Sequence, residues 1–180
     1  MNETDLIKQA QAGEPKAFSE LYARYHKAVY TYIYYRVGQR PLAEDLTSDV
    51  FERVVKQIHT WRPVGKPFIA WLYTIAGNLV INHTKRQNRI EWLPLNDQEV
   101  YSGDSLMAQI GKKLETEKIA EALNQLTEEQ RQVIILRFLQ QQTVTTVAKA
   151  IGKSDASIKS LQRRAINALR RILEKEGAHV

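Results

Sequence analysis

The side chains best suited to chemistry in this sequence are basic and amide groups near its C-terminal end. The candidates for contacting DNA are Lys159, Ser160, Gln162, Arg163 and Arg164. Lysine and arginine neutralise phosphates, and arginine and glutamine have the fork and amide geometry that reads guanine and adenine edges. Residues 155–175 hold six basic and two acidic side chains. An isolated amphipathic helix with a solvated basic face would show the same charges, so the neighbouring elements decide the interpretation.

Those elements form a predicted helix-turn-helix. The spacing of apolar residues predicts a short helix over 143–151, a turn at 152–154 that contains Gly152, and a longer helix over 155–175. Ser154 is suited to cap the longer helix. In this arrangement the second helix enters the major groove of DNA. The context therefore favours DNA recognition by the basic face.

A second charged group lies on a predicted helix over 41–58. Its acidic residues, Glu44, Asp45, Asp49 and Glu52, outnumber its basic residues, Arg53 and Lys56. An acidic face in a basic chain is not suited to contact DNA. It is either a solvated face, stabilised in part by the helix dipole, or a docking surface for a basic protein. The residues alone favour the solvated face.

A third group interleaves aromatic, amide and basic side chains over 60–89. Its members include Trp61, Arg62, Lys66, Trp71, Tyr73, Asn78, Asn82, His83, Lys85 and Arg86. Aromatic faces stack on any base and cationic grooves follow the phosphates, so this mixture is typical of single-stranded DNA binding. An extruded base also needs hydrogen-bonding groups, a role open to Asn78. The alternative is packing within a helical bundle, which we favour for Trp71.

Composition excludes several classes of protein. The 180 residues carry a net charge of +6, are 43% hydrophobic and include no cysteine. The hydrophobic content excludes wholesale disorder, and the lack of cysteine excludes a disulfide scaffold, a cysteine-ligated metal centre and a thiolate nucleophile. No run approaches the roughly 18–20 apolar residues of a membrane span, and the N-terminal residues are polar and acidic. We therefore expect a cytoplasmic protein without membrane insertion.

The positive charge is divided between two halves of the chain. Residues 1–92 hold 13 basic and 9 acidic side chains, residues 93–113 hold 2 and 3, and residues 114–180 hold 11 and 8. The middle segment is rich in turn formers and small polar residues, which is typical of a linker. We expect two domains, 1–92 and 114–180, joined by a tether over 93–113.

Outside the tether the sequence has the period of helices rather than strands, so we expect an all-α fold. The first domain should contain four helices: one capped by Thr4 or Asp5, and three that begin near Pro15, at Pro41 and at Pro67. In the second domain a helix over 114–126 precedes a helix that opens with a capping box at Thr127. The helix-turn-helix follows.

Several motifs together carry a family resemblance. In the first half they are Ala17-Phe18, Ala43-Glu44-Asp45-Leu46 with Asp49-Val50-Phe51, and the run from Phe68 to Asn78; in the second half they are Leu126-Thr127-Glu128-Glu129-Gln130-Arg131, Val147-Ala148 and Ser157-Ile158-Lys159-Ser160. The first set resembles the promoter-melting domain of extracytoplasmic-function sigma factors of the sigma-70 superfamily. The second set is similar to their domain that reads the −35 element. Two modules that match in the family's order are far more specific than a lone helix-turn-helix.

The resemblance implies a role for each group of residues. Asp45, Asp49 and Glu52, with Leu46 and Phe51 beside them, would dock on the clamp helices of the largest subunit of core RNA polymerase. Trp61, Arg62, Lys66, Asn78, Asn82, Lys85 and Arg86 would capture the −10 element, with Asn78 at the pocket for a flipped base. Lys159, Ser160, Gln162, Arg163 and Arg164 would face the −35 element. The resemblance thus reverses our preference for a merely solvated acidic face.

The implied protein is a transcription initiation factor without cofactor, metal or nucleotide hydrolysis. It binds core polymerase and then promoter DNA, both double- and single-stranded, and the family often employs an anti-sigma factor. No homo-oligomer is expected. A tether of 21 residues extends to at most about 70 Å, comparable to two turns of DNA, so both surfaces can reach elements on one duplex.

The sequence departs from the family pattern at a few positions. Thr145 and Thr146 stand where two acidic residues are usual, and Leu161 stands where a basic residue is common. The loop after Trp61 is longer than the usual form and contains proline, and Ser48 replaces a frequent glutamine. These departures concern the preferred promoter sequence more than the function.

Two other functions fit parts of the sequence. A helix-turn-helix repressor or activator would bind palindromic duplex without polymerase, but the chain has no obvious heptad seam for a dimer and the acidic helix would be unexplained. An enzyme is disfavoured because the histidines, His26, His59, His83 and His179, are scattered. The sequence also lacks a His-Glu-x-x-His motif and a phosphate-binding loop.

Overall fold

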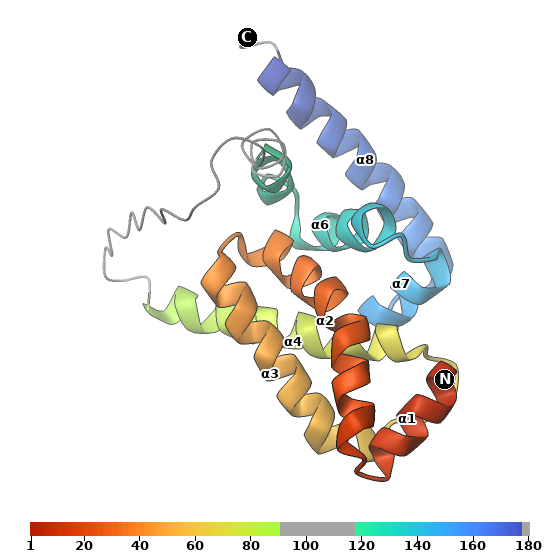
Figure 1. Ribbon diagram of the computed structural model, residues 1–180. Coiled ribbons are helices and arrows are strands. Elements are labelled where there is room, and N and C mark those ends of the chain that lie inside the picture. The colour runs from red at the N-terminus through yellow and green to blue at the C-terminus, as the bar shows by residue number, and fades with distance from the viewer. Residues whose placement is uncertain (91–117, 178–180) are drawn as a thin grey trace, which may run out of the picture.

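The computed structural model describes residues 1–90 and 118–177, and the regular elements in these two ranges are all helical. The first half contains α1 (Glu3–Gln11), α2 (Pro15–Val37), α3 (Arg40–Gln57), the short 3₁₀ helix η1 (Ile58–Thr60) and α4 (Phe68–Ile90). The second half contains a helical segment over 118–124, α6 (Glu128–Ile134), the π-helical turn η2 (Ile135–Leu139), α7 (Val144–Ile151) and α8 (Asp155–Gly177) (Figure 1). The prediction of an all-α fold is confirmed. The expected tether at 93–113 lies outside the described residues, and the division into two domains stays a prediction.

In the second half, capping residues set helix ends where the sequence predicts them. The hydroxyl of Thr127 accepts a hydrogen bond from the backbone of Gln130, whose side chain accepts one in return from the Thr127 amide, and this forms the capping box of α6. Ser154 caps α8 by accepting a hydrogen bond from the Ser157 amide at 3.1 Å. Gly152 ends α7 with a left-handed backbone, φ 80°. Glycine adopts that conformation without steric cost.

The cap of α1 differs from the prediction. Neither Thr4 nor Asp5 is the N-cap; the side-chain oxygen of Asn2 accepts a hydrogen bond from the Asp5 amide at 2.8 Å. Asparagine is at least as good an N-cap as threonine, and it lies upstream of both candidates, so the helix begins earlier.

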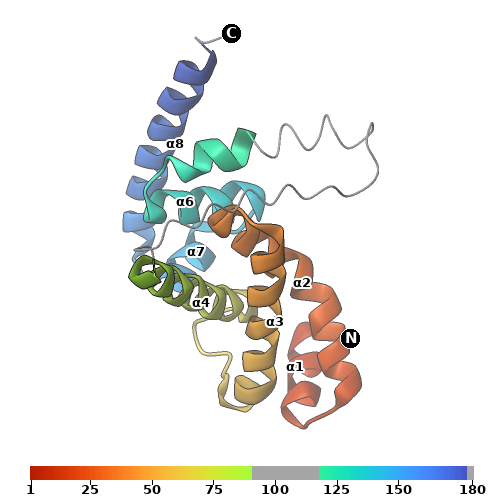
Figure 2. The ribbon, with the colours of Figure 1, turned by 90° about the vertical axis from the view of Figure 1, so that its left-hand side faces the viewer.

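The core of the first half lies where α2, α3 and α4 meet, with α1 packed across α2 (Figure 2). Among its fully buried side chains are Tyr32 and Ile33 on α2 and Leu72 and Tyr73 on α4. The Tyr32 and Tyr73 rings pack edge to face, 5.1 Å apart. In the second half, α8 packs against α6 and α7 around Leu136 and Ile158.

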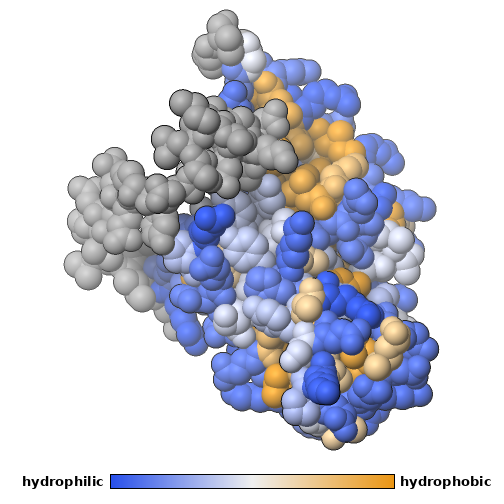
Figure 3. All heavy atoms as spheres, in the orientation of Figure 1, coloured by the Kyte–Doolittle hydropathy of each residue, from blue (hydrophilic) through white to orange (hydrophobic). Residues whose placement is uncertain are grey.

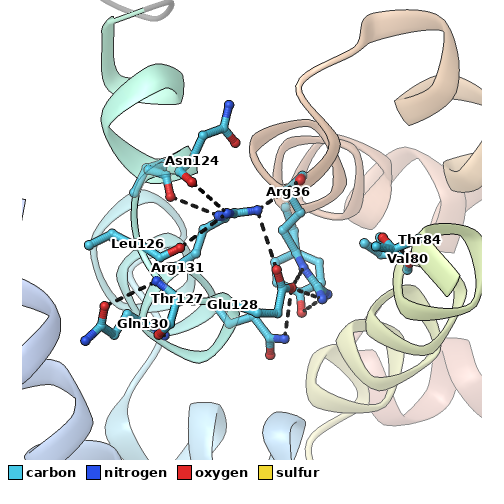
Figure 4. A network of polar contacts seen from close by, with 12 residues as sticks. Arg36, Val80, Thr84, Asn124, Leu126, Thr127, Glu128, Gln130 and Arg131 are labelled. Atoms are coloured by element: carbon cyan, nitrogen blue, oxygen red, sulfur yellow. Dashed lines mark hydrogen bonds and ion pairs between the residues drawn. The ribbon is translucent and has the colours of Figure 1, made fainter. Parts of the chain in front are cut away.

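The two halves are in direct contact. Helix α7 packs along α4, and η2 contacts α2. At the centre of this junction lies Arg36, whose side chain is fully buried (Figure 4). Its Nε donates to Glu128 Oε1 at 2.7 Å, its Nη2 pairs with the same carboxylate, and its Nη1 donates to the Tyr32 hydroxyl at 2.8 Å. The counter-charge for a buried cation of the first half therefore comes from the second half.

Further contacts support this pair. Arg131, one turn after Glu128, donates to the backbone carbonyl of Arg36 at 3.3 Å. On α4, Gly77 faces the buried guanidinium, and a Cβ atom at this position would lie 3.3 Å from both Arg36 Nη1 and the Tyr32 hydroxyl. A glycine in the middle of α4 thus leaves room for the arginine.

The junction can be tested by the variant Glu128→Gln. This change leaves the buried Arg36 guanidinium without its counter-charge, and we expect the free energy of unfolding to fall by about 1–3 kcal/mol, less than for a fully buried pair because the Glu128 side chain is 44% exposed. Denaturant unfolding of the full chain measures the loss.

The control variant is Glu129→Gln. Glu129 also lies in the first turn of α6, so it shares the helix-dipole effect, but it pairs with Lys153 at the surface. We expect a loss of at most about 1 kcal/mol. Equal losses in the two variants would contradict the special role of Glu128.

Candidate protein and nucleic-acid interfaces

Helix α3 presents the predicted acidic surface to solvent. Its inner face is buried through Ala43, Val50 and Val54, which pack against the rest of the first half. The carboxylates of Asp45, Asp49 and Glu52 lie on the opposite side of the helix and are exposed. The helical period that builds the core thus also groups the three acidic residues on one outer face.

The carboxylates on this face are exposed to solvent, and one of them has a neighbouring lysine as its partner. Lys56 Nζ donates to Glu52 Oε1 at 2.6 Å, and this hydrogen bond lowers the pKa of the Glu52 carboxyl. Ion pairs between such exposed groups contribute little to stability. The acidic face is therefore suited to binding rather than to holding the fold.

The two apolar residues expected beside the acidic face behave differently. Leu46 is only 6% exposed and belongs to the core, so it holds α3 in place and offers no surface in this structure. Phe51 is half-buried and packs edge to face against Tyr22, with ring centres 4.8 Å apart. These rings line a groove of about 320 Å³ between α2 and α3, together with Phe18, Ser19, Leu21, Val54 and Val55.

The sequence analysis missed an aromatic row beside this groove. Tyr22, His26, Tyr30 and Tyr34 follow one another at intervals of four residues along α2, with ring centres 4.6, 6.3 and 6.0 Å apart. Tyr22 lies next to the buried Leu21, yet 44% of its surface is exposed. The regular spacing was visible in the sequence, but whether the row faces the core or solvent depends on how α2 packs against α3.

Helix α4 carries the amide and basic residues of the predicted −10 surface. Asn78, Asn82, Lys85 and Arg86 are all exposed and follow at helical spacing along one side. The neighbours of Asn78, Gly77 and Leu79, are buried, so Asn78 marks the boundary between the core and the outer face. Trp71 is half-buried and packs on Phe68, with ring centres 5.6 Å apart, as the packing interpretation predicts.

The loop before α4 brings Trp61 and Arg62 to the same end of the first half. The Trp61 ring packs edge to face on Phe68 at 5.4 Å, and its buried Nε1 has no hydrogen-bond partner among the described residues. Arg62 is exposed and folds back on the loop, since its Nη1 donates to the carbonyls of His59 and Trp61 at 2.7 and 2.9 Å. The Gln11 side chain, which the sequence analysis did not single out, also bonds to this loop.

Lys66 lies apart from the exposed −10 residues. Its Nζ donates to Thr74 Oγ1 at 2.7 Å. The Thr74 hydroxyl lies within hydrogen-bonding distance of two carbonyls, that of Ala70 in its own helix at 2.9 Å and that of Ala150 in α7 at 3.1 Å. Partial burial lowers the pKa of Lys66. In this structure Lys66 is therefore held by α4 of its own half, through a threonine that lies beside α7.

Helix α8 shows the two faces expected of a reading helix. Ile158, Leu161 and Ala165 are buried, whereas Lys159, Ser160, Arg163 and Arg164 are exposed. Gln162 is half-buried and accepts a hydrogen bond from Arg137 Nε at 2.9 Å, so its amide is already held by its own protein. Four of the five predicted −35 residues thus share an open surface.

The unusual residues of the helix-turn-helix have structural roles. Leu161, found where a basic residue is common, is 4% exposed and fills the core under α8. Thr145 donates a hydrogen bond from its hydroxyl to Asp155 Oδ2 at 2.9 Å, which links α7 to the first turn of α8. An acidic residue at position 145 would place a second carboxylate beside Asp155.

The second half also exposes apolar surface. An apolar area lies over this half in Figure 3, and the large apolar side chains exposed in this half are Ile119, Phe138, Leu139 and Leu173. Phe138 and Leu139 belong to the π-helical turn. The change from the α-helical period at this turn was not visible in the sequence.

Other chemistries find no support in the described ranges. No three histidine, aspartate or glutamate side chains of residues 1–90 and 118–177 lie close enough together to hold a metal ion. Within the same residues, no helix combines the length and the apolar character that crossing a membrane requires.

Comparisons with known proteins agree with this geometry. The family model for Sigma-70 region 2 matches residues 21–90, and that for Sigma-70, region 4 matches residues 122–171. The ECF RNA polymerase sigma factor BldN of Streptomyces coelicolor is 41% identical over 179 residues, which cover 96% of this chain and 66% of that protein. The ECF RNA polymerase sigma factor SigX of Bacillus subtilis is 32% identical over 88% of this chain and 84% of its own length.

A solved structure shows the same fold. CnrH, in complex with the cytosolic domain of CnrY, superimposes with a TM-score of 0.74 at 22% identity, over 94% of this chain and 96% of that one. Both sigma-70 regions occur here in order, on a two-part helical fold that exposes an acidic and two basic or amide-rich surfaces. The chain belongs to the extracytoplasmic-function sigma factors of the sigma-70 family.

Proposed function

We propose that this sigma factor directs core RNA polymerase to promoters and divides the work among three exposed surfaces. The acidic face of α3 binds the clamp helices of the largest polymerase subunit, the outer face of α4 with the loop at Trp61 captures the −10 element, and the basic face of α8 reads the −35 element. The observation that carries the proposal is the separation of the acidic face, Asp45 to Glu52, from the basic face of α8, Lys159 to Arg164, since each is exposed on its own helix.

The charges match the proposed partners. Asp45, Asp49 and Glu52 form an acidic patch in a chain of net charge +6, and such a patch steers a basic protein surface rather than DNA. Lys159, Arg163 and Arg164 neutralise phosphates or read base edges in the major groove. The Gln162 amide oxygen accepts a hydrogen bond from Arg137, so the contribution of Gln162 to the −35 surface is to hold the Arg137 side chain in place.

Capture of unpaired bases favours strand opening at the −10 element. Opening costs stacking energy of about 1.4 kcal/mol per base-pair step, and a base stacked on an aromatic side chain recovers about 1–3 kcal/mol. Trp61 offers the aromatic ring, Asn78 offers a hydrogen-bonding amide, and Lys85 and Arg86 follow the backbone. The chain itself needs no catalytic activity, since the polymerase performs the chemistry in the cytoplasm.

Residues 1–92 and 114–180 act as two domains in this proposal. The matches of the region 2 and region 4 models to 21–90 and 122–171 support the division. Elements that lie apart on DNA require the domains to separate, which breaks the Arg36–Glu128 pair and the packing of α7 along α4.

An anti-sigma factor belongs among the proposed partners. The sigma factor RpoE from Bartonella quintana, 21% identical with a TM-score of 0.71, has been solved in complex with the anti-sigma factor NepR. A partner of this kind would bind the same polymerase-facing or DNA-facing surfaces, or hold the two halves together.

In vitro transcription tests the function as a whole. Core polymerase with the full chain should initiate at specific sites in a library of promoter sequences, and core polymerase alone should not. Sequencing the promoters that yield transcripts identifies the preferred −35 and −10 elements. Failure to bind core polymerase, or initiation without sequence preference, would refute the proposed function.

The docking surface is tested by the double variant Asp45→Lys/Asp49→Lys. Reversing two charges should weaken core binding by about tenfold or more, because the basic clamp surface then meets like charge. Binding to a −35 duplex should survive. The matched control is Glu14→Lys/Glu20→Lys, which makes the same charge change at two exposed positions, the N-cap of α2 and a residue within it. Equal loss of core and DNA binding would contradict the division of labour.

The reading helix is tested by Arg164→Ala. Loss of a guanidinium at a base edge should reduce the free energy of binding to the preferred −35 sequence by about 1–3 kcal/mol. It should also relax the base preference at one base pair. Arg171→Ala, about two turns further along the same helix and also exposed, should weaken binding evenly across sequences. An unchanged −35 profile for Arg164→Ala, measured by binding to randomised duplexes, would remove this residue from the reading face.

A further inference from the structure

Two backbone carbonyls converge on one side-chain amide at the start of the proposed −10 loop. Gln11 Nε2 donates to the carbonyl of Ile58 at 3.0 Å and to that of Trp61 at 2.9 Å. These carbonyls flank η1, and the Trp61 amide closes the turn by donating to Ile58 at 3.1 Å. The Gln11 amide nitrogen thus donates both of its hydrogens to the same turn. Among side chains, only a primary amide or a cationic group carries a nitrogen that can donate two such bonds.

The turn held by Gln11 is where the loop leaves the folded core. Trp61 is half-buried, whereas residues 62–65 are exposed, and Val64 is 84% exposed. At the other end the loop is held by the hydrogen bond from Lys66 to Thr74. The path of the exposed residues is therefore set by its two ends, and Gln11 holds the end that carries Trp61 and Arg62.

The Trp61 ring packs on Phe68, but the backbone on the opposite side of the turn faces a cavity. Between α1 and the loop lies a cavity of about 340 Å³, lined by Thr4, Ile7, Lys8, Gln11, His59, Trp61, Arg62 and Pro63. Because the space behind the turn is open, the Trp61 backbone is fixed on this side by hydrogen bonds from Gln11 and Arg62. Arg62 is an exposed side chain on the loop itself, so Gln11 is the anchor that comes from outside the loop.

Helix α1 is firmly placed and can serve as the fixed support. Leu6, Ile7 and Ala10 are buried against the first half, and the Tyr25 hydroxyl of α2 donates to the Glu3 carboxylate. The match to Sigma-70 region 2 begins only at residue 21, so it does not include α1.

We propose that Gln11 is a positioning residue for capture of the −10 element. It acts through the backbone of Ile58 and Trp61, and so presents the Trp61 ring and the Arg62 guanidinium to the unpaired strand. This inference rests on the function proposed above. It adds a role for α1 in promoter opening, although the Gln11 side chain itself need not touch DNA.

The test compares holoenzymes formed with full-length Gln11→Met, Gln11→Glu and wild-type chains. Methionine keeps the length but donates no hydrogen bond, and glutamate turns an acceptor toward two carbonyls. Gln9→Met is the matched control, because Gln9 is an exposed glutamine on the same helix. The DNA probe is a promoter library with the −35 element that the wild-type chain selects and a randomised −10 region.

We expect Gln11→Met to lower promoter opening, measured by permanganate reactivity of unpaired thymines, by about tenfold and to flatten the −10 base preference. Gln11→Glu should lower promoter opening further than Gln11→Met does. Core affinity, binding to the −35 duplex and the thermal midpoint of unfolding should stay close to wild type for Gln11→Met, and Gln9→Met should match wild type in every measurement.

Two results would overturn the inference while the proposed function stands. One is wild-type opening with an unchanged −10 profile in Gln11→Met. The other is a parallel loss of core binding, −35 binding and thermal stability, which would make Gln11 merely structural. If the wild-type holoenzyme itself shows no promoter-specific opening, the proposed function fails and the inference fails with it.

Discussion

A guanidinium that is closed off from water must find its counter-charge within the protein, and for Arg36 that charge comes from 92 residues further along the chain. Burial of a cation is costly unless it is paired and fully hydrogen-bonded. Glu128 and the Tyr32 hydroxyl meet this requirement from the two halves of the molecule. The packing of α7 along α4 joins the same two halves.

Around this junction, α3, α4 and α8 each bury one face in the core and expose the other to solvent. The inner residues of α3, α4 and α8 are apolar and buried, and their outer faces carry acidic, amide-rich and basic groups respectively. The modest net charge of +6 therefore results from surfaces of opposite sign. A sigma factor must contact a basic protein surface and an acidic polymer at the same time, and separate helices keep these two kinds of surface apart.

Much of this was predictable because helical period alone determines which residues share a face. The exposure of Asp45 and Asp49, and the caps at Thr127 and Ser154, follow from local pattern. The burial of Leu46, the capture of Lys66 by Thr74 and the hold of Arg137 on Gln162 depend on tertiary neighbours. The Arg36–Glu128 pair and the bonds of Gln11 join residues 92 and 47–50 positions apart, for which the local sequence carries no signal.

Gly77 limits which sequences this fold can accept. An added methyl group would require Arg36 and Tyr32 to give way by a few tenths of an ångström, and a larger side chain would displace them. The position precedes Asn78, which faces outward. Two adjacent positions of α4 are therefore under different constraints: the arginine behind position 77 limits the size of the side chain there, whereas the exposed position 78 is free of that limit.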